Sequence, residues 1–155
     1  MLTLALDNDS DVFVKTDAGE VIGANSDGHL AVINVTAHAG NKDVTFDQNS
    51  FITLGECTGP VTNLSFSYNR NPESGKPFAQ LRIQKININT SSMETRGSIE
   101  IIWKNSSAGD AFIYATKKFT YNVITSNSDY DLILSKTVVN TDSTIDDEKL
   151  VSIIV

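Results

Sequence analysis

The alternation of apolar and polar residues is the feature that most constrains how this chain can fold. Segments such as LTLAL (2–6), LAVINVTA (30–37) and SIEIIW (98–103) repeat with a period of two. Because successive side chains of a β-strand point to opposite faces of a sheet, this period indicates strands with one buried face. We expect strands at residues 2–6, 12–14, 30–37, 64–68, 79–88, 98–103, 111–124 and 149–155.

Clusters of turn-forming residues separate these segments, and the sequence shows no convincing helical pattern. Short strands joined by such turns predict an all-β fold, an antiparallel sandwich of immunoglobulin-like kind. The cysteine pair of antibody domains is missing from the sequence, so the analogy concerns architecture alone. The turn clusters are NDSD (8–11), TDAGE (16–20), NSDG (25–28), AGNKD (39–43), NPESGKP (71–77), KNSSAGD (104–110) and TSNSD (125–129).

The composition fits one globular domain, or one domain with a fragment of a second. Of the 155 residues, 40% are hydrophobic and 20% are charged, which is enough apolar material for a core. No window approaches eighteen consecutive apolar residues, and no basic segment follows Met1. We therefore expect neither membrane insertion nor a signal peptide.

The net charge of -7 is divided unevenly along the chain. Residues 1–56 carry nine acids and two bases, residues 57–128 four acids and eight bases, and residues 129–155 six acids and two bases. This division would suit head-to-tail contacts between modules or an anionic ligand at the basic middle, although solvated charges on strand faces are the simpler interpretation. The overall acidity argues against a nucleic-acid partner.

The sequence contains few residues that could form a disulfide or bind zinc. Cys57 is the only cysteine, which excludes an internal disulfide, and we expect it to be a small buried side chain. Because only His29 and His38 accompany it, we expect no zinc site.

The stretch LDNDSDV places Asp7, Asp9 and Asp11 at alternate positions, as in calcium-binding loops. An EF-hand also requires a glycine at the sixth loop position and a glutamate at the twelfth, and these positions hold Val12 and Ala18. We interpret the stretch as a short acidic turn between two apolar segments, and we predict no metal and no cofactor.

Trp103 lies in a strand whose two faces are clearly different. Ile99, Ile101 and Trp103 share one face, while Glu100 and Lys104 share the other. This pattern predicts that Trp103 packs in the core, and the alternative is a tryptophan that stacks on a sugar.

The segment AQLRIQKINI (79–88) breaks the alternation. Leu81, Ile83 and Lys85 share one parity, whereas Arg82 and Gln84 share the other with two isoleucines. The break predicts a β-bulge near Lys85. Arg82, Gln84 and Lys85 then become candidate polar contacts for a ligand.

The loop NRNPESGKP (69–77) concentrates glycine, proline and charge, including Arg70 and Lys76. Binding loops have this composition, and so do solvated hairpin tips. Under the first interpretation, the loop would join Arg82 and Lys85 in a polar platform for a polysaccharide. An exposed aromatic side chain, Tyr68 or Tyr114, would lie beside this platform.

The sequence gives little support for a catalytic function. It contains no GxSxG nucleophile motif, no phosphate-binding glycine loop and no isolated pair of carboxylates. We predict a protein that is not an enzyme.

The end of the chain partly repeats its beginning. Because a unit of two or three strands cannot bury its own face, the second copy must pair with other residues. We expect a sandwich module at residues 1–126 and a partial second module, or added strands, at 127–155. The matching positions are Leu4 and Leu6 with Leu132 and Leu134, 14–17 with 139–142, and 30–35 with 150–155.

The segments LTLALDNDSDVFVKTDAGEV (2–21), KKFTYNVI (117–124) and YDLILSKTVV (130–139) carry a resemblance to a known family. The chain resembles the immunoglobulin-like modules of bacteriophage and prophage tail-tip, tail-fibre and host-specificity proteins. The resemblance covers residues 1–37 and 119–155, and residues 45–118 match in strand pattern only. Some such proteins place a collagen-like linker between modules, whereas this chain has TSNSD (125–129), which favours direct abutment.

The resemblance implies a structural or adsorption role in the virion tail, within an assembly such as a trimer, and it transfers no catalytic residues. Neighbouring modules or tail proteins would be the partners, and the protein would be made in the bacterial cytoplasm. The alternatives are a receptor-recognition module that binds a host-surface polysaccharide and a bacterial adhesin module. These roles share one fold, so the sequence alone does not separate them.

Overall fold

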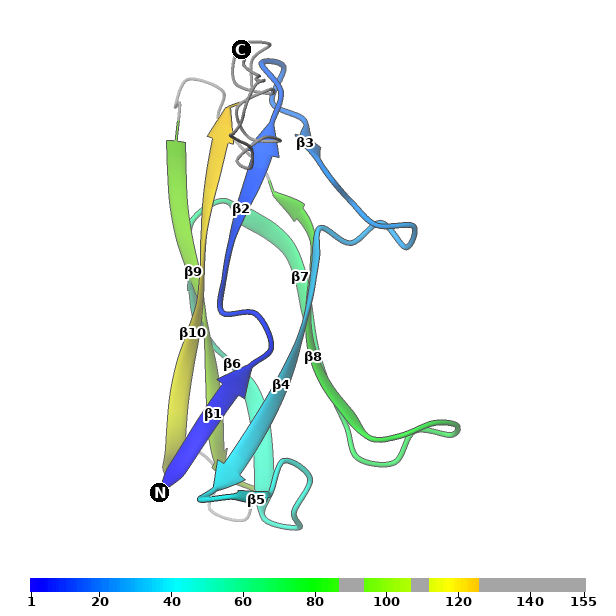
Figure 1. Ribbon diagram of the computed structural model, residues 1–155, viewed down its shortest axis with the longest axis vertical. Helices are drawn as coiled ribbons and strands as arrows, with labels where there is room; N and C mark the ends of the chain where they lie inside the picture. Colours follow the sequence, from blue (N-terminus) through cyan, green and yellow to red (C-terminus); the bar gives the residue numbers. More distant parts are fainter. Residues whose placement is uncertain (87–93, 107–111, 126–155) are drawn as a thin grey trace, which may run out of the picture.

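The computed structural model describes residues 1–86, 94–106 and 112–125, and in these ranges the chain forms ten β-strands (Figure 1). The strands are β1 (Leu2–Leu6), β2 (Ser10–Lys15), β3 (Val21–Ile22), β4 (Ala31–Ala39), β5 (Lys42–Asp43), β6 (Ser50–Thr58), β7 (Val61–Asn69), β8 (Phe78–Ile86), β9 (Glu94–Asn105) and β10 (Ile113–Thr125). The described ranges contain no helix, and thus none with the length and hydrophobicity to span a membrane.

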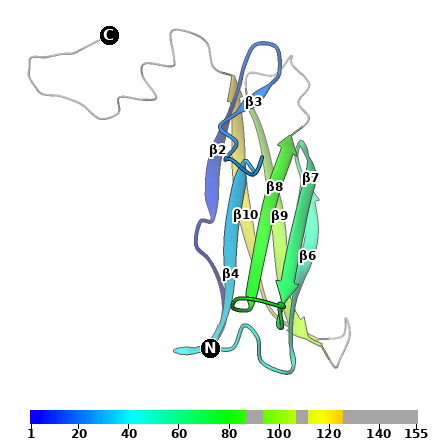
Figure 2. The same cartoon turned by 90° about the vertical axis from the view of Figure 1, so that its right-hand side faces the viewer.

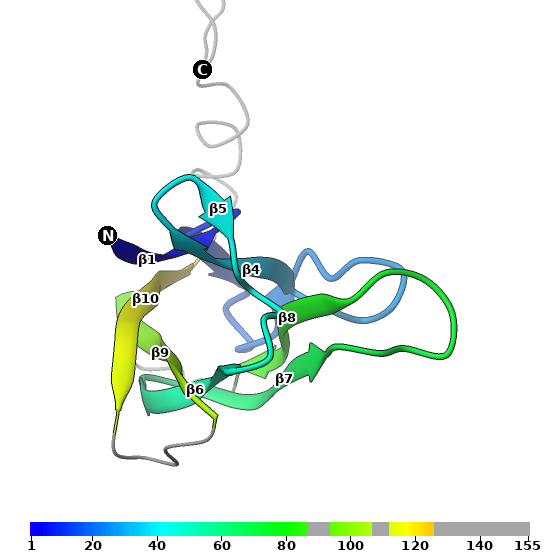
Figure 3. The same cartoon turned by 90° about the horizontal axis from the view of Figure 1, so that it is seen from below.

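The strands form two sheets that lie in separate layers (Figures 2 and 3). The first sheet has the order β1-β4-β8-β7, with β5 added to β4, and the second has the order β3-β2-β10-β9-β6. All neighbours run antiparallel except β2 and β10, which are parallel. The predicted all-β antiparallel sandwich is confirmed, with one parallel pair added.

The acidic turn after β1 carries the chain from the first sheet to the second. The Asp7 amide donates to the Asn34 carbonyl (3.0 Å) on the first sheet, and the Thr120 amide donates to the Asp9 carbonyl (3.1 Å) on the second. This turn places β2 beside β10. The short acidic turn predicted from the sequence is confirmed, and it works as a bridge between the layers.

The core lies between the sheets and is made by the apolar faces of the alternating strands. Ile33, Leu81, Ile99 and Phe119 are fully buried there. Trp103 is 2% exposed, so its predicted place in the core is confirmed and a ligand has no free indole face on which to stack.

The β-bulge predicted near Lys85 is present. Asn63 of β7 pairs with Lys85, and the next β7 residue, Leu64, pairs with Ile83, so Gln84 is the extra residue on β8. The register also shifts on β7 between Val61 and Asn63. Because of these irregularities, Ile86 returns to the buried face and the alternation resumes.

Strand β6 was not among the strands expected from the sequence, and its irregular pairing explains why. Its register against β9 shifts between Leu54 and Cys57, so inward and outward residues do not alternate through the strand. Cys57 lies beyond this shift and is exposed, so the prediction of a buried cysteine is wrong.

The chain enters and leaves the sandwich at opposite ends of its long axis (Figure 1). We call the end that holds Met1, β5 and the start of β10 the proximal end, and the end at the tips of β2 and β10 the distal end. The strand expected at 149–155, the last two residues of the one expected at 79–88, and the second module at 127–155 lie outside the described residues.

Candidate functional site

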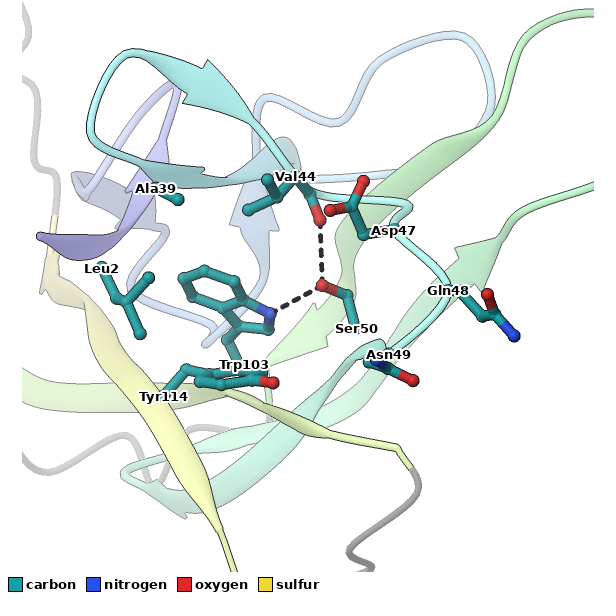
Figure 4. A pocket seen from close by; sticks show the side chains of 9 residues that line it. All are labelled: Leu2, Ala39, Val44, Asp47, Gln48, Asn49, Ser50, Trp103 and Tyr114. Atoms are coloured by element: carbon teal, nitrogen blue, oxygen red, sulfur yellow. Dashed lines mark hydrogen bonds between the residues drawn. The ribbon is translucent and has the colours of Figure 1, made fainter.

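A pocket of about 320 Å³ lies at the proximal end, between the loop that precedes β6 and the aromatic side chains of β9 and β10 (Figure 4). Leu2 and Val44 contribute apolar surface to its lining, and the polar residues 47–49 line the rim. Trp103 and Tyr114 complete the lining, with their ring centroids 4.9 Å apart. Pockets with this mixture of apolar surface and a few polar groups are common binding sites.

Ser50 connects the loop to the aromatic wall of the pocket. The Trp103 indole N–H donates to the Ser50 hydroxyl (3.0 Å), and this hydroxyl donates to the Val44 carbonyl (2.9 Å; Figure 4). Both polar groups are buried and satisfied, which is what keeps a buried tryptophan and serine from destabilising the fold. The contact also holds the indole plane in one orientation.

The start of the same loop is held by Thr45, which is fully buried. Its hydroxyl accepts from the Ala37 amide (2.8 Å) and donates to the Asp43 carboxylate (2.6 Å). The hydrogen bonds from the Thr45 hydroxyl and amide lower the pKa of Asp43 below its ordinary value of 3.8. The charge of Asp43 therefore stabilises the loop at neutral pH.

Two side chains of the β7 end clamp the loop from the other side. The Tyr68 hydroxyl donates to the Thr45 carbonyl (2.5 Å) and lies 3.0 Å from the Ser50 carbonyl. The Arg70 guanidinium donates to the carbonyls of Gln48 (3.2 Å) and Ser50. Burial raises the pKa of the Tyr68 phenol, although the nearby guanidinium opposes this shift. Because these contacts fix the loop, the pocket is largely preorganised.

A second group of polar side chains crosses the outer face of the first sheet. The Asn34 amide and side-chain N–H groups donate to the two oxygens of Asp7 (2.9 and 2.8 Å), and Gln80 donates to the Asn34 oxygen (2.9 Å). Arg82 donates twice to the Gln80 oxygen (3.1 and 2.7 Å). We call these four residues the polar row, and the Phe78 ring lies beside it, 5.9 Å from the Arg82 guanidinium carbon.

The structure distributes the residues predicted as ligand contacts over four places. Arg82 belongs to the polar row, whereas Gln84 and Lys85 are exposed at the β8 bulge, toward the distal end. Lys85 lies seven residues beyond Phe78, roughly 23 Å along the strand, so it does not share a surface with the 69–77 loop. Lys76 is exposed in that loop, which projects from the sandwich (Figure 3).

The predicted exposed aromatic side chains are not exposed. Tyr68 is half-buried and stacks on Phe46, and Tyr114 is half-buried against Trp103. Arg70, predicted as a ligand contact, is also half-buried and holds the loop. These three residues build the proximal end and do not form a free platform.

Sequence reasoning missed Ser50, Asn34 and Gln80. Asn34 and Gln80 carry a signal that could have been used, because each lies on the outward face of an alternating strand, and Gln80 shares that face with Arg82. Their proximity depends on the pairing of β4 with β8, which periodicity does not reveal.

The described part of the chain gives little support for a metal site or a reactive thiol. It contains no group of three or more His, Cys, Asp or Glu side chains placed to hold a metal ion. Although Cys57 is exposed, its neighbours remove part of the water around the sulfur, and this desolvation, with Glu100 and Glu56 nearby, raises the pKa of the thiol above its ordinary value of 9.0. The raised pKa disfavours the nucleophilic thiolate.

The chain was compared with protein-family models, curated proteins and solved structures. None of the three comparisons finds a match.

Proposed function

We propose that the protein is a structural, non-enzymatic module of a phage or prophage tail or fibre protein, which positions the host-attachment apparatus of the virion. The observation that carries this proposal is that the chain enters and leaves the sandwich at opposite ends (Figure 1). Modules connected in this way add their lengths. The 13 residues of β10 span roughly 43 Å, so each module would extend the appendage by about that distance.

The order of the strands supports the proposal. In an immunoglobulin constant-type domain, strands A, B, E and D form one sheet and strands C, F and G form the other. The order β1-β4-β8-β7 corresponds to the first arrangement and β6-β9-β10 to the second. The partners would then be neighbouring modules or tail proteins, in a homo-oligomer such as a trimer.

In-frame deletion of the module from the tail protein tests this proposal. A spacer predicts an appendage shorter by about 40 Å in electron micrographs, with particles that still bind to host cells. The matched control is an Arg82→Ala/Lys85→Ala variant of the intact protein, which should leave both length and attachment unchanged. Loss of attachment in that control would contradict the spacer role.

A second function, binding of a host-surface polysaccharide by a receptor-recognition or adhesin module, is favoured by the polar row. Amide, carboxylate and guanidinium groups held by one another, with Phe78 alongside, suit sugar hydroxyl groups. The test is a panel of bacterial surface polysaccharides against the wild type and a Gln80→Ala/Arg82→Ala variant, with Lys85→Ala as the control. Binding lost only in the double variant would support this function, and absence of binding to every polysaccharide would oppose it.

A further inference from the structure

Apolar side chains are exposed around the proximal pocket. Leu2 is 41% exposed, Phe112 49% and Ile113 50%, and the Phe112 ring contacts Tyr114 at 5.0 Å between centroids. We call Leu2, Phe112, Ile113 and Tyr114 the proximal patch. Since soluble proteins rarely expose contiguous apolar side chains without a partner, this patch indicates a contact surface.

A second apolar patch lies near the distal end, on the outer face of the second sheet. Val14 pairs with Ile22 on one side and with Ile124 on the other, so the three side chains form one row across β3, β2 and β10. Val12 lies two residues away on the same face, and both Val12 and Ile22 are 52% exposed. We call Val12, Val14, Ile22 and Ile124 the distal patch.

The two patches differ in shape and composition. The proximal patch borders a pocket with an aromatic wall, whereas the distal patch is a row of branched aliphatic side chains on a sheet face. Contact between two different surfaces is heterologous, and it propagates from molecule to molecule in a head-to-tail line. Contact between two copies of one patch would instead close into a symmetric dimer.

We propose that the proximal patch of one copy of this chain binds the distal patch of a second copy. This inference rests on the proposed structural function, and it names the surfaces through which the modules would meet. The distal patch includes Ile124, and β10 ends one residue later at Thr125, so a module joined to the end of this strand would be connected beside this patch. The pocket of about 320 Å³ can receive a branched aliphatic side chain such as that of Ile22.

The contact between separate copies is weak, because each patch is small compared with a standard protein interface. Within one polypeptide the connection would keep adjacent modules at high effective concentration, which strengthens the same contact. A weak pairwise affinity is therefore the expected behaviour of the isolated chain.

Sedimentation velocity of the full chain over a range of high concentrations tests the proposal with two variants. Phe112→Ser/Ile113→Ser alters the proximal patch, and Val12→Ser/Ile22→Ser alters the distal patch. Val32→Ser is the matched control, because Val32 is 37% exposed on the outer face of the first sheet, away from both patches. Circular dichroism and melting temperature establish that each variant is folded.

We expect the wild type and the Val32→Ser control to form a concentration-dependent series of oligomers, and each double variant alone to stay monomeric. An equimolar mixture of the two double variants should form a 1:1 dimer that does not grow further, since each variant retains the patch that the other lacks. Dimers of either variant alone would indicate a symmetric contact and overturn the proposal. Absence of association in the wild type would also overturn it, yet would leave the deletion test of the spacer role unaffected.

Discussion

Lys15 is unusual among the described residues, because its side chain is buried although none of these residues pairs with it. It is 1% exposed and lies on the inward face of β2 with Phe13. Within the described ranges, no hydrogen bond or ion pair satisfies its ammonium group. Removing a charge from water costs free energy that only a well-placed partner offsets, so we expect Lys15 to reduce the stability of the sandwich.

Replacement of Lys15 by methionine should therefore raise the free energy of unfolding. The two side chains have similar length and both are unbranched, so we expect a gain of about 1 kcal/mol or more in urea denaturation. Lys42→Met, at an exposed position of β5, is the control and should change stability little. Destabilisation by Lys15→Met alone would mean that the ammonium has a stabilising partner.

Tyr68 makes the stability of the fold depend on pH in the alkaline range. Burial raises the pKa of its phenol above the ordinary value of 10.0, so the unfolded chain releases this proton at a lower pH than the folded chain. The stabilising contribution of Tyr68 is thus complete below pH 10 and is lost as the pH rises through the raised pKa.

We expect the denaturation midpoint to fall as the pH is raised above 10, and to fall less steeply in Tyr68→Phe. Tyr121 adds to the dependence in the wild type and in the variant, because burial also raises its pKa. Ultraviolet absorbance of the tyrosinate gives an independent titration of the same groups. Equal slopes for the wild type and Tyr68→Phe would show that the folded state leaves the pKa of Tyr68 unchanged.

At the scale of elements, the packing of β9 against β10 depends on Gly97. The Tyr121 hydroxyl accepts from the Val61 amide (3.1 Å) and donates to the Thr58 carbonyl (3.2 Å), and its ring passes over Gly97, its register partner. A Cβ atom at Gly97 would overlap this ring and lie 2.6 Å from the Thr58 carbonyl oxygen. The Tyr121 side chain therefore fills the space that a side chain at position 97 would need.

Gly97→Ala should lower the free energy of unfolding by about 2 kcal/mol or more, since the rigid strands on both sides prevent a small adjustment. Gly75→Ala is the comparison: its φ of +92° is unfavourable for alanine, but no atom lies within 4 Å of the added Cβ. We expect a smaller loss of about 1 kcal/mol there. Equal losses at the two positions in urea denaturation would show that contact with the Tyr121 ring does not determine the cost of a side chain at Gly97.

Alternation predicted the elements whose pattern is regular, such as β1, β4 and β9, because one face of each is buried against the other sheet. It missed β6, where a bulge disrupts the period, and β3 and β5, which are two residues long and exist through pairing with their neighbours. The same bulge exposes Cys57. An irregular strand carries no period from which exposure can be inferred.

The candidate sites were harder to predict than the elements. Arg82 was found because parity places it outward. Its partner Gln80, however, is bonded in turn to Asn34, which lies 46 residues from Gln80 along the chain. The Ser50–Trp103 contact spans 53 residues, and it depends on the pairing of β6 with β9. Contacts of this kind follow from which strands become neighbours, and the periodicity of a single sequence does not contain that information.

For the whole molecule, the question is whether residues 1–126 form a complete folding unit. All ten described strands lie between Leu2 and Thr125, and β10, the last of them, is paired on both sides, with β2 and with β9. A chain that ends at Ser126 keeps every one of these strand pairings. The core side chains Phe119, Tyr121 and Val123 are all retained as well.

A chain that ends at Ser126 should therefore show the same β-sheet circular dichroism as the full chain and a similar melting temperature. A chain that ends at Lys118 is the control, because it removes the half of β10 that carries Phe119 and the parallel pairing with β2, and it should not fold. If the chain that ends at Ser126 is unfolded, residues 127–155 complete the first sandwich. The partial repeat would then be a set of added strands, and the head-to-tail contact would have to form around them.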